Sequence, residues 1–125
     1  MPEILSRIGQ ISITVKDLDR AVEFYREKLG LKHLFTVPKM AFFDCGGIRL
    51  MLAIPESAEF DHPSSVLYFT VGDIQRAFQE MSHRGVPFEG PPHLIAKMEK
   101  TDLWMAFFRD SESNLLSLMC DVERK

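Results

Sequence analysis

The side chains of this sequence best suited to catalysis or metal binding are its four histidines and two cysteines, and their spacing matches no known motif. The histidines are His33, His62, His83 and His93. None of them forms the HxH or HExxH spacing that places two ring nitrogens on one ion. Cys45 and Cys120 form no CxxC pair, so we expect free thiols. These local patterns predict no bound metal ion, no cofactor and no nucleophile paired with a base.

Another set of side chains could bind a small organic molecule without forming a covalent bond. Arg49 could pair with an anionic group, and Tyr68 and Trp104 could stack on a planar group. Gln10 and Ser117 could orient the ligand through hydrogen bonds. Structural alternatives stay open, because Arg49 could extend into solvent at a sheet edge and Trp104 could belong to the core or to a dimer contact.

An internal repeat indicates which elements hold these side chains. Residues 12–21 read SITVKDLDRA and residues 68–77 read YFTVGDIQRA, with five identities in ten positions at an offset of 56. Each copy begins with an alternating β-branched segment and passes through an aspartate into helical spacing. The sequence therefore predicts in each copy a strand, an aspartate N-cap at Asp17 or Asp73, and an amphipathic helix.

Glycines mark the ends of both predicted helices, at Gly30 and Gly85. Three short strands should follow each helix. We expect these strands at residues 32–37, 40–44 and 48–54 in the first copy, and at residues 87–89, 103–109 and 115–121 in the second. The chain is then a single domain over residues 1–125, made of two βαβββ modules at about residues 4–57 and 64–122.

Two longer connections interrupt this pattern. Residues 55–65 are polar and join the two copies, while residues 90–101 form a long connection within the second copy. Pro91 and Pro92 disfavour regular structure at the start of the second connection. That connection is either a mobile flap over a cleft or a solvated loop, and its role stays open.

Strand parity assigns the candidate side chains to one face of each sheet. Neighbouring residues of a strand point to opposite faces, so Leu50, Leu52, Leu116 and Leu118 fall on the face that meets the helices. The opposite, inward face includes Gln10, Arg49, Met51, Val66, Tyr68 and Ser117, and Ser12, Thr14 and Ala53 share it. A mixture of apolar and polar groups is typical of a small-molecule pocket. Met51 could instead be a gap filler in a packed core.

These elements together resemble the vicinal oxygen chelate superfamily, which contains glyoxalase I, extradiol dioxygenases and bleomycin resistance proteins. The resemblance rests on residues 9–21, Phe24-Tyr25, Leu29-Gly30-Leu31, residues 69–74, Phe108-Arg109-Asp110 and Asn114-Leu115. It implies an α+β fold in which two paired βαβββ modules form a curled eight-stranded mixed sheet around a cavity, with the helices outside.

The same resemblance implies where a metal would bind. Enzymes of this superfamily hold one divalent ion at four positions, which correspond to Gln10, Met51, Val66 and Ser117. The ion acts there as a Lewis acid on two neighbouring substrate oxygens. Gln10 is a ligand type that the superfamily uses, whereas a thioether is too soft for Mg, Mn or Fe, a neutral hydroxyl is a poor ligand, and valine has no donor atom. We therefore expect no divalent metal at this position.

Composition limits the partners of the chain. Its 125 residues are 46% hydrophobic and 26% charged, as in an ordinary folded domain, and the net charge of −3 argues against nucleic acid as a partner. No apolar run approaches the ~20 residues that cross a bilayer, and the first residues lack the pattern of an export signal. We therefore expect a cytoplasmic protein without a membrane partner.

Three functional hypotheses follow. The leading one is a protein similar to the bleomycin resistance branch, which binds a small organic molecule in the concave sheet without the catalytic metal. The first alternative is a metal-dependent lyase, isomerase or dioxygenase of the glyoxalase type with an altered metal site. The second is a non-catalytic dimerisation or regulatory module. Because members of the superfamily commonly dimerise, the resemblance also implies a homodimer, with the cavity built within one chain or across two.

Overall fold

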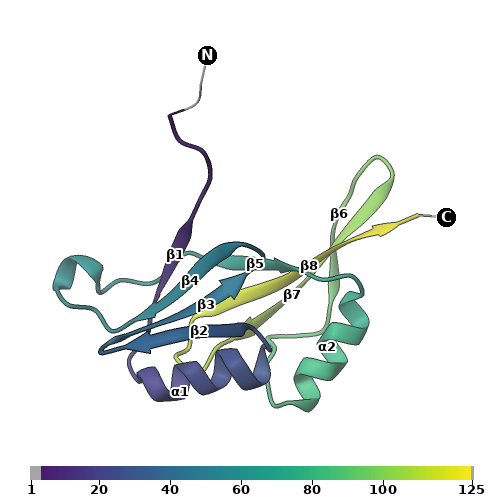
Figure 1. The fold of residues 1–125 in the computed structure, drawn as a ribbon. Helices are drawn as coiled ribbons and strands as arrows, with labels where there is room; N and C mark the ends of the chain where they lie inside the picture. The colour runs from purple at the N-terminus through teal and green to yellow at the C-terminus, as the bar shows by residue number, and fades with distance from the viewer. Residues whose placement is uncertain (1–3, 125) are drawn as a thin grey trace. The chain divides into compact units, whose positions relative to one another are not determined.

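The repeat in the sequence is also a repeat of structure (Figure 1). The computed structural model describes residues 4–124. The elements of the first half are β1 (Gln10–Thr14), α1 (Leu18–Glu23) with its π-helical continuation η1 (Phe24–Lys28), β2 (Lys32–Val37), β3 (Met40–Cys45) and β4 (Ile48–Ala53). Those of the second half are β5 (Leu67–Thr70), α2 (Ile74–His83), β6 (His93–Lys97), β7 (Thr101–Arg109) and β8 (Leu115–Glu123). Between the halves lies one 3-10 turn, η2 (Ala58–Phe60).

Both helices begin and end at the residues that the sequence predicts. The Asp17 carboxylate accepts a hydrogen bond from the Arg20 backbone N–H at 3.0 Å, and Asp73 accepts one from the Arg76 N–H at 3.1 Å. These bonds provide acceptors for backbone N–H groups of the first turn, which have no acceptor within the helix. Gly30 and Gly85 follow the helices with φ angles of 72° and 92°, a conformation that glycine adopts without steric cost.

Each half forms its own four-stranded mixed sheet. The strand order is β1-β4-β3-β2 in the first half and β5-β8-β7-β6 in the second, with β1 parallel to β4 and β5 parallel to β8. The predicted α+β class and the βαβββ order are therefore confirmed, with the eight strands divided four and four. The chain separates into two compact units at the Ser64–Ser65 bond.

The apolar core of each unit lies on the helix face of its sheet, as the strand parity predicts. In the first unit, Leu50 and Leu52 of β4 are buried together with Tyr25 and Phe43. In the second unit, the buried residues include Ile74 of α2, Phe108 of β7, and Leu116 and Leu118 of β8. Burial of these side chains holds each helix against its sheet and leaves the other face of the sheet for a site.

One predicted strand is placed differently in the structure. Residues 87–89 form only an isolated bridge, in which Phe88 pairs with Phe108. The edge strand is instead β6, which lies inside the segment that we predicted as an irregular connection over residues 90–101. β6 pairs antiparallel with β7, and Pro91 and Pro92 directly precede its first residue, His93. Prolines restrict only the residues beside them, so they are compatible with a strand that starts just after them at a sheet edge.

The turn between β7 and β8 depends on one buried carboxylate. Asp110 is 4% exposed and accepts hydrogen bonds from the backbone N–H of Glu112 at 2.8 Å and of Asn114 at 2.9 Å. It also accepts one from the side-chain amide of Asn114 at 2.9 Å. The turn passes through Ser113 with a positive φ of 67°, which these bonds stabilise.

Replacing Asp110 by Ala should lower the free energy of unfolding by about 1–3 kcal/mol, because it leaves partly buried N–H donors without acceptors. Urea denaturation followed by circular dichroism measures the change. Asp121→Ala, at an exposed position of β8, is the control and should change stability by less than about 0.5 kcal/mol. Equal effects of the two substitutions would show that the turn does not depend on the Asp110 carboxylate.

Candidate functional site

A polar cluster occupies the start of β1 and β4 on the inward face of the first sheet. Gln10 is the register partner of Arg49, and Ser12 is the partner of Met51. The Arg49 Nε donates a hydrogen bond to Gln10 Oε1 at 2.7 Å. The Gln10 amide nitrogen in turn donates to the Met51 sulfur at 3.6 Å. Three of the residues predicted to bind a ligand are therefore in contact within one unit, because parallel pairing brings their strands side by side.

Aromatic side chains hold the other side of the Arg49 guanidinium. Its Cζ atom lies 5.1 Å from the centroid of the Phe42 ring, which is within the range of a cation–π interaction. Phe35 of the edge strand β2 stacks on Phe42 with a centroid distance of 4.5 Å and an interplanar angle of 27°. Arg49 is exposed, and its planar group is oriented by an amide on one side and by a ring on the other.

A pocket of about 200 Å³ lies next to this cluster on the same face of the first sheet. Its floor is formed by Ser12 and Thr14 of β1, Met51 and Ala53 of β4, and Met40 of β3. The strand parity predicts that Ser12, Thr14, Met51 and Ala53 share the inward face, and the pocket confirms this placement. Met51 belongs to both structures, because it lines the pocket and contacts Gln10.

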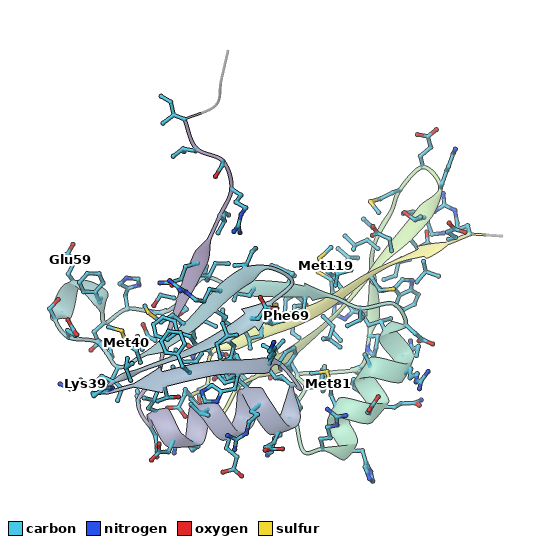
Figure 2. All side chains as sticks on the ribbon, in the orientation of Figure 1. Lys39, Met40, Glu59, Phe69, Met81 and Met119 are labelled. Carbon is cyan, nitrogen blue, oxygen red and sulfur yellow. The ribbon has the colours of Figure 1, made fainter. Side chains whose placement is uncertain are left out.

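The connection between the two repeats closes the pocket. The Thr14 backbone N–H donates to the Ser64 hydroxyl at 3.0 Å, and the Thr14 hydroxyl donates to the Phe60 carbonyl at 3.3 Å. These bonds fold residues 54–64 back over the end of β1. Figure 2 shows Met40 at the start of β3, on the side of the loop that carries Glu59. The pocket lies entirely within the first unit.

The folded-back connection adds side chains that sequence reasoning did not assign to the site. Glu56, Phe60 and His62 line the pocket, together with Ser64. His62 Nδ1 is 3.1 Å from the carbonyl oxygen of Pro63. No local pattern in this polar segment indicates that it returns to the sheet, because its contacts are with residues more than forty positions earlier in the chain.

In the second unit, Tyr68 and Ser117 are register partners on β5 and β8. Tyr68 is 46% exposed, and its ring meets that of Phe107 edge-on at a centroid distance of 6.1 Å. Ser117 is 0% exposed, and its hydroxyl lies 2.8 Å from the Leu118 carbonyl oxygen and 3.3 Å from that of Ala106. Tyr68 is therefore free to stack on a planar group, whereas the Ser117 hydroxyl already has backbone partners. Val66 is half-buried and directly precedes β5.

Trp104 does not join these residues. Trp104 is the register partner of Cys120 on β8, so the two side chains point to the same face of the sheet. Cys120 lies three residues after Ser117, and side chains an odd number of residues apart on a strand point to opposite faces. Trp104 and Ser117 therefore lie on opposite faces of the sheet. Trp104 lines a groove with Gly72 and Asp73, next to the N-terminus of α2. The structure therefore places this predicted stacking residue on the helix side of the second sheet.

The donor atoms at the four metal positions do not suit a divalent ion. The Gln10 side-chain oxygen accepts a hydrogen bond from the positively charged Arg49, and Met51 offers only a thioether. The Ser117 hydroxyl is directed at carbonyl oxygens, and Val66 has no donor atom. No group of three or more His, Cys, Asp or Glu side chains suited to a metal occurs within residues 4–124. A neighbouring guanidinium would also repel a dication.

The two cysteines are free thiols. Burial raises the pKa of the Cys45 thiol, and the Asp44 carboxylate raises this pKa further. Cys120 is buried, and its sulfur lies 3.7 Å from the Gly72 carbonyl oxygen. A raised pKa keeps Cys45 protonated at neutral pH, which makes it a weak nucleophile.

Among residues 4–124, none of the helices combines the length and the apolar character needed to cross a bilayer.

Comparison with known proteins identifies the family. Residues 7–118 match the model of the Glyoxalase/Bleomycin resistance protein/Dioxygenase superfamily. Two uncharacterized proteins of Bacillus subtilis (strain 168) are similar: YraH is 29% identical over 90% of this chain and 96% of its own length, and YurT is 31% identical over 90% and 98%. The crystal structure of lactoylglutathione lyase from Agrobacterium tumefaciens shares the fold, with a TM-score of 0.76, 22% identity, and coverage of 94% of this chain and 96% of that one. The chain therefore belongs to the Glyoxalase/Bleomycin resistance protein/Dioxygenase superfamily.

Proposed function

We propose that this protein binds a small organic molecule on the inward face of its first sheet and does so without a metal ion. The observation that carries the proposal is the pocket of about 200 Å³ beside Gln10, together with the hydrogen bond that Arg49 donates to the Gln10 oxygen. The pocket offers a place for a ligand, and the hydrogen bond occupies the oxygen that a metal would need.

The composition of the pocket fits a ligand with an apolar body. Met40, Met51, Ala53 and Phe60 supply apolar surface, and the hydroxyl groups around them offer a few hydrogen bonds. Drug-sized ligands occupy pockets of about 300–1,000 Å³. A pocket of about 200 Å³ therefore accepts a fragment-sized group, and any further part of the ligand extends over the open sheet toward Arg49.

A thermal-shift screen in the presence of a chelator tests this function. The screen includes planar antibiotics, thioesters, 2-oxo compounds, sugar phosphates and small aromatic acids. A ligand at 100 times its dissociation constant adds about 2.7 kcal/mol to the free energy of unfolding, which gives a readily measured shift. The proposal requires hits that bind equally well after metal is removed. Ligand binding that returns only when Ni, Zn, Mn or Fe is added back would support the metal-dependent enzyme instead.

Filling the pocket should abolish binding of any such hit. Ala53→Phe places a ring into the pocket from its floor, so we expect at least a tenfold loss of affinity, or about 1.4 kcal/mol. Isothermal titration calorimetry measures the loss. Ala58→Phe makes the same chemical change at an exposed position of η2 that does not line the pocket, and it should bind as the wild type does. Full affinity in Ala53→Phe would show that the ligand binds elsewhere.

A further inference from the structure

Arg49 differs from four other arginines of the chain in the charge of its partner. Arg26, Arg84, Arg109 and Arg124 each form an ion pair with a carboxylate. Arg49 instead donates its Nε hydrogen to the neutral amide oxygen of Gln10 and lies over the neutral ring of Phe42. Within the described residues 4–124, no carboxylate forms an ion pair with Arg49, although Asp44 of β3 is its cross-strand register partner, and the two terminal nitrogens of Arg49 have no hydrogen-bond acceptor.

These two neutral contacts orient the guanidinium before any ligand arrives. A free arginine side chain loses rotamer entropy when it binds an anion, and a side chain that is already held loses less. Gln10 uses the Nε edge of the group, so the edge with the two terminal nitrogens remains available. Those nitrogens present parallel N–H donors, which match the two oxygens of a carboxylate.

The available edge lies close to the pocket. Arg49 and Met51 occupy the same face of β4 two residues apart, a distance of about 7 Å along a strand. Met51 forms part of the pocket floor, so Arg49 follows the pocket along the same face of β4, two residues before Met51. Glu56 lines the pocket from the connection at the other end of β4. Repulsion from the Glu56 carboxylate disfavours an anionic group inside the pocket, whereas the Arg49 guanidinium attracts one. The bidentate contact with Arg49 must outweigh the repulsion from Asp44, its cross-strand partner on β3.

We propose that Arg49 binds the carboxylate of a small organic acid, whose aromatic or branched apolar body occupies the pocket between Met40 and Met51. This inference rests on the proposed function and adds the chemical class of the ligand. The fixed positive charge lies beside Gln10, one of the four positions at which the superfamily resemblance implies a metal ligand, and it supplies an attraction for anions that requires no metal.

Matched pairs of acids and amides test the assignment. The probes are benzoate and 3-phenylpropionate, each compared with its uncharged amide by isothermal titration calorimetry at low salt. We expect the wild type to prefer the acid by about 10- to 100-fold, the range of one charge-assisted bidentate contact. Arg49→Met should remove this preference, and Arg49→Lys should retain part of it because it keeps the charge but not the paired donors.

Arg109→Met is the matched control. Arg109 is an exposed arginine on β7 whose Nε donates to a carboxylate, Glu89, at 2.8 Å, so its charge is already compensated. This variant should keep the preference for the acid. The Arg49 Nε–H resonance gives a second, direct measurement, and it should shift when the acid is added and remain in place with the amide.

The outcomes separate this inference from the proposed function. Equal binding of acid and amide, lost in Ala53→Phe, would overturn the role of Arg49 and leave the pocket as a binding site. A preference for the acid that survives in Arg49→Met would also overturn it. If no member of either series binds the wild type, both this inference and the pocket as the site for such ligands are wrong.

Discussion

Replacing Ser117 by Glu should lower the free energy of unfolding by about 3 kcal/mol or more, enough to unfold much of a marginally stable domain. Ser117 is 0% exposed, and its hydroxyl is directed at the carbonyl oxygens of Ala106 and Leu118. A glutamate at this position would bring a larger side chain into a packed region and would place its oxygens near other acceptors. The cost of burying a carboxylate without a partner is several kcal/mol even after the surroundings relax.

This substitution concerns function because the superfamily resemblance implies a metal-binding glutamate at the position of Ser117. The comparison variant is Met51→Glu, at the corresponding position of the first module. Met51 is half-buried and faces a pocket, so a carboxylate there can remain hydrated or approach Arg49, and the loss of stability should be below about 1 kcal/mol. Urea denaturation of both variants measures the difference. A stable Ser117→Glu protein would contradict this account and would weaken the proposal of metal-free binding.

Phe108→Ala should destabilise the protein by about 3–5 kcal/mol, the usual cost of removing a buried aromatic side chain from a core. Phe108 is 0% exposed on β7, and its ring packs against Phe88 at a centroid distance of 5.3 Å. Phe88 in turn meets Phe78 of α2 edge-on at 4.8 Å. Loss of the Phe108 ring would leave a cavity between the sheet and the segment that follows α2, because the neighbouring rings can collapse only partly into the space.

Two further variants define this effect. Phe108→Leu keeps most of the apolar volume and should cost clearly less than Phe108→Ala. Phe60→Ala removes a ring that is 61% exposed in the pocket-closing connection, and it should change stability by about 0.5 kcal/mol or less. The midpoint of urea denaturation, at an unchanged slope, gives each value. A cost below about 1 kcal/mol for Phe108→Ala would show that this aromatic cluster does not support the second unit.

Much of the fold follows from short-range patterns in the sequence. The aspartates at positions 17 and 73 cap helices because their carboxylates bond to amides three residues later, and this requires no distant partner. The side chains of β4 and β8 alternate between the two faces of the sheet, and this alternation is also a local property of the chain. It assigns four residues to the core, Leu50, Leu52, Leu116 and Leu118, and all four are buried. The fold class, the βαβββ order and the inward position of Gln10, Arg49 and Met51 could therefore be predicted.

Prediction failed where a segment has no period of its own. β6 forms because the backbone N–H and C=O groups along the edge of β7 can pair with it. The local sequence does not show this pairing, and the neighbouring prolines suggest a loop instead. The sequence left two roles open for Trp104, stacking on a ligand or packing in the core, and its pairing with Cys120 places it on the helix side of its sheet. The position of this side chain depends on which residues of β7 and β8 are paired, and that pairing is a long-range property.

Local sequence patterns are sufficient to identify the two modules, apart from β6, and the side chains that share a face of β1 and β4, since these depend on contacts between near neighbours in the chain. The return of residues 54–64 to the pocket, and the contacts of Arg49 with Gln10 and Phe42, appear only in the folded structure. Arg49 and Gln10 are separated by 39 positions, and Thr14 and Phe60 by 46. Residues so far apart in the sequence come into contact only when the strands of the sheet have paired and brought the two segments together.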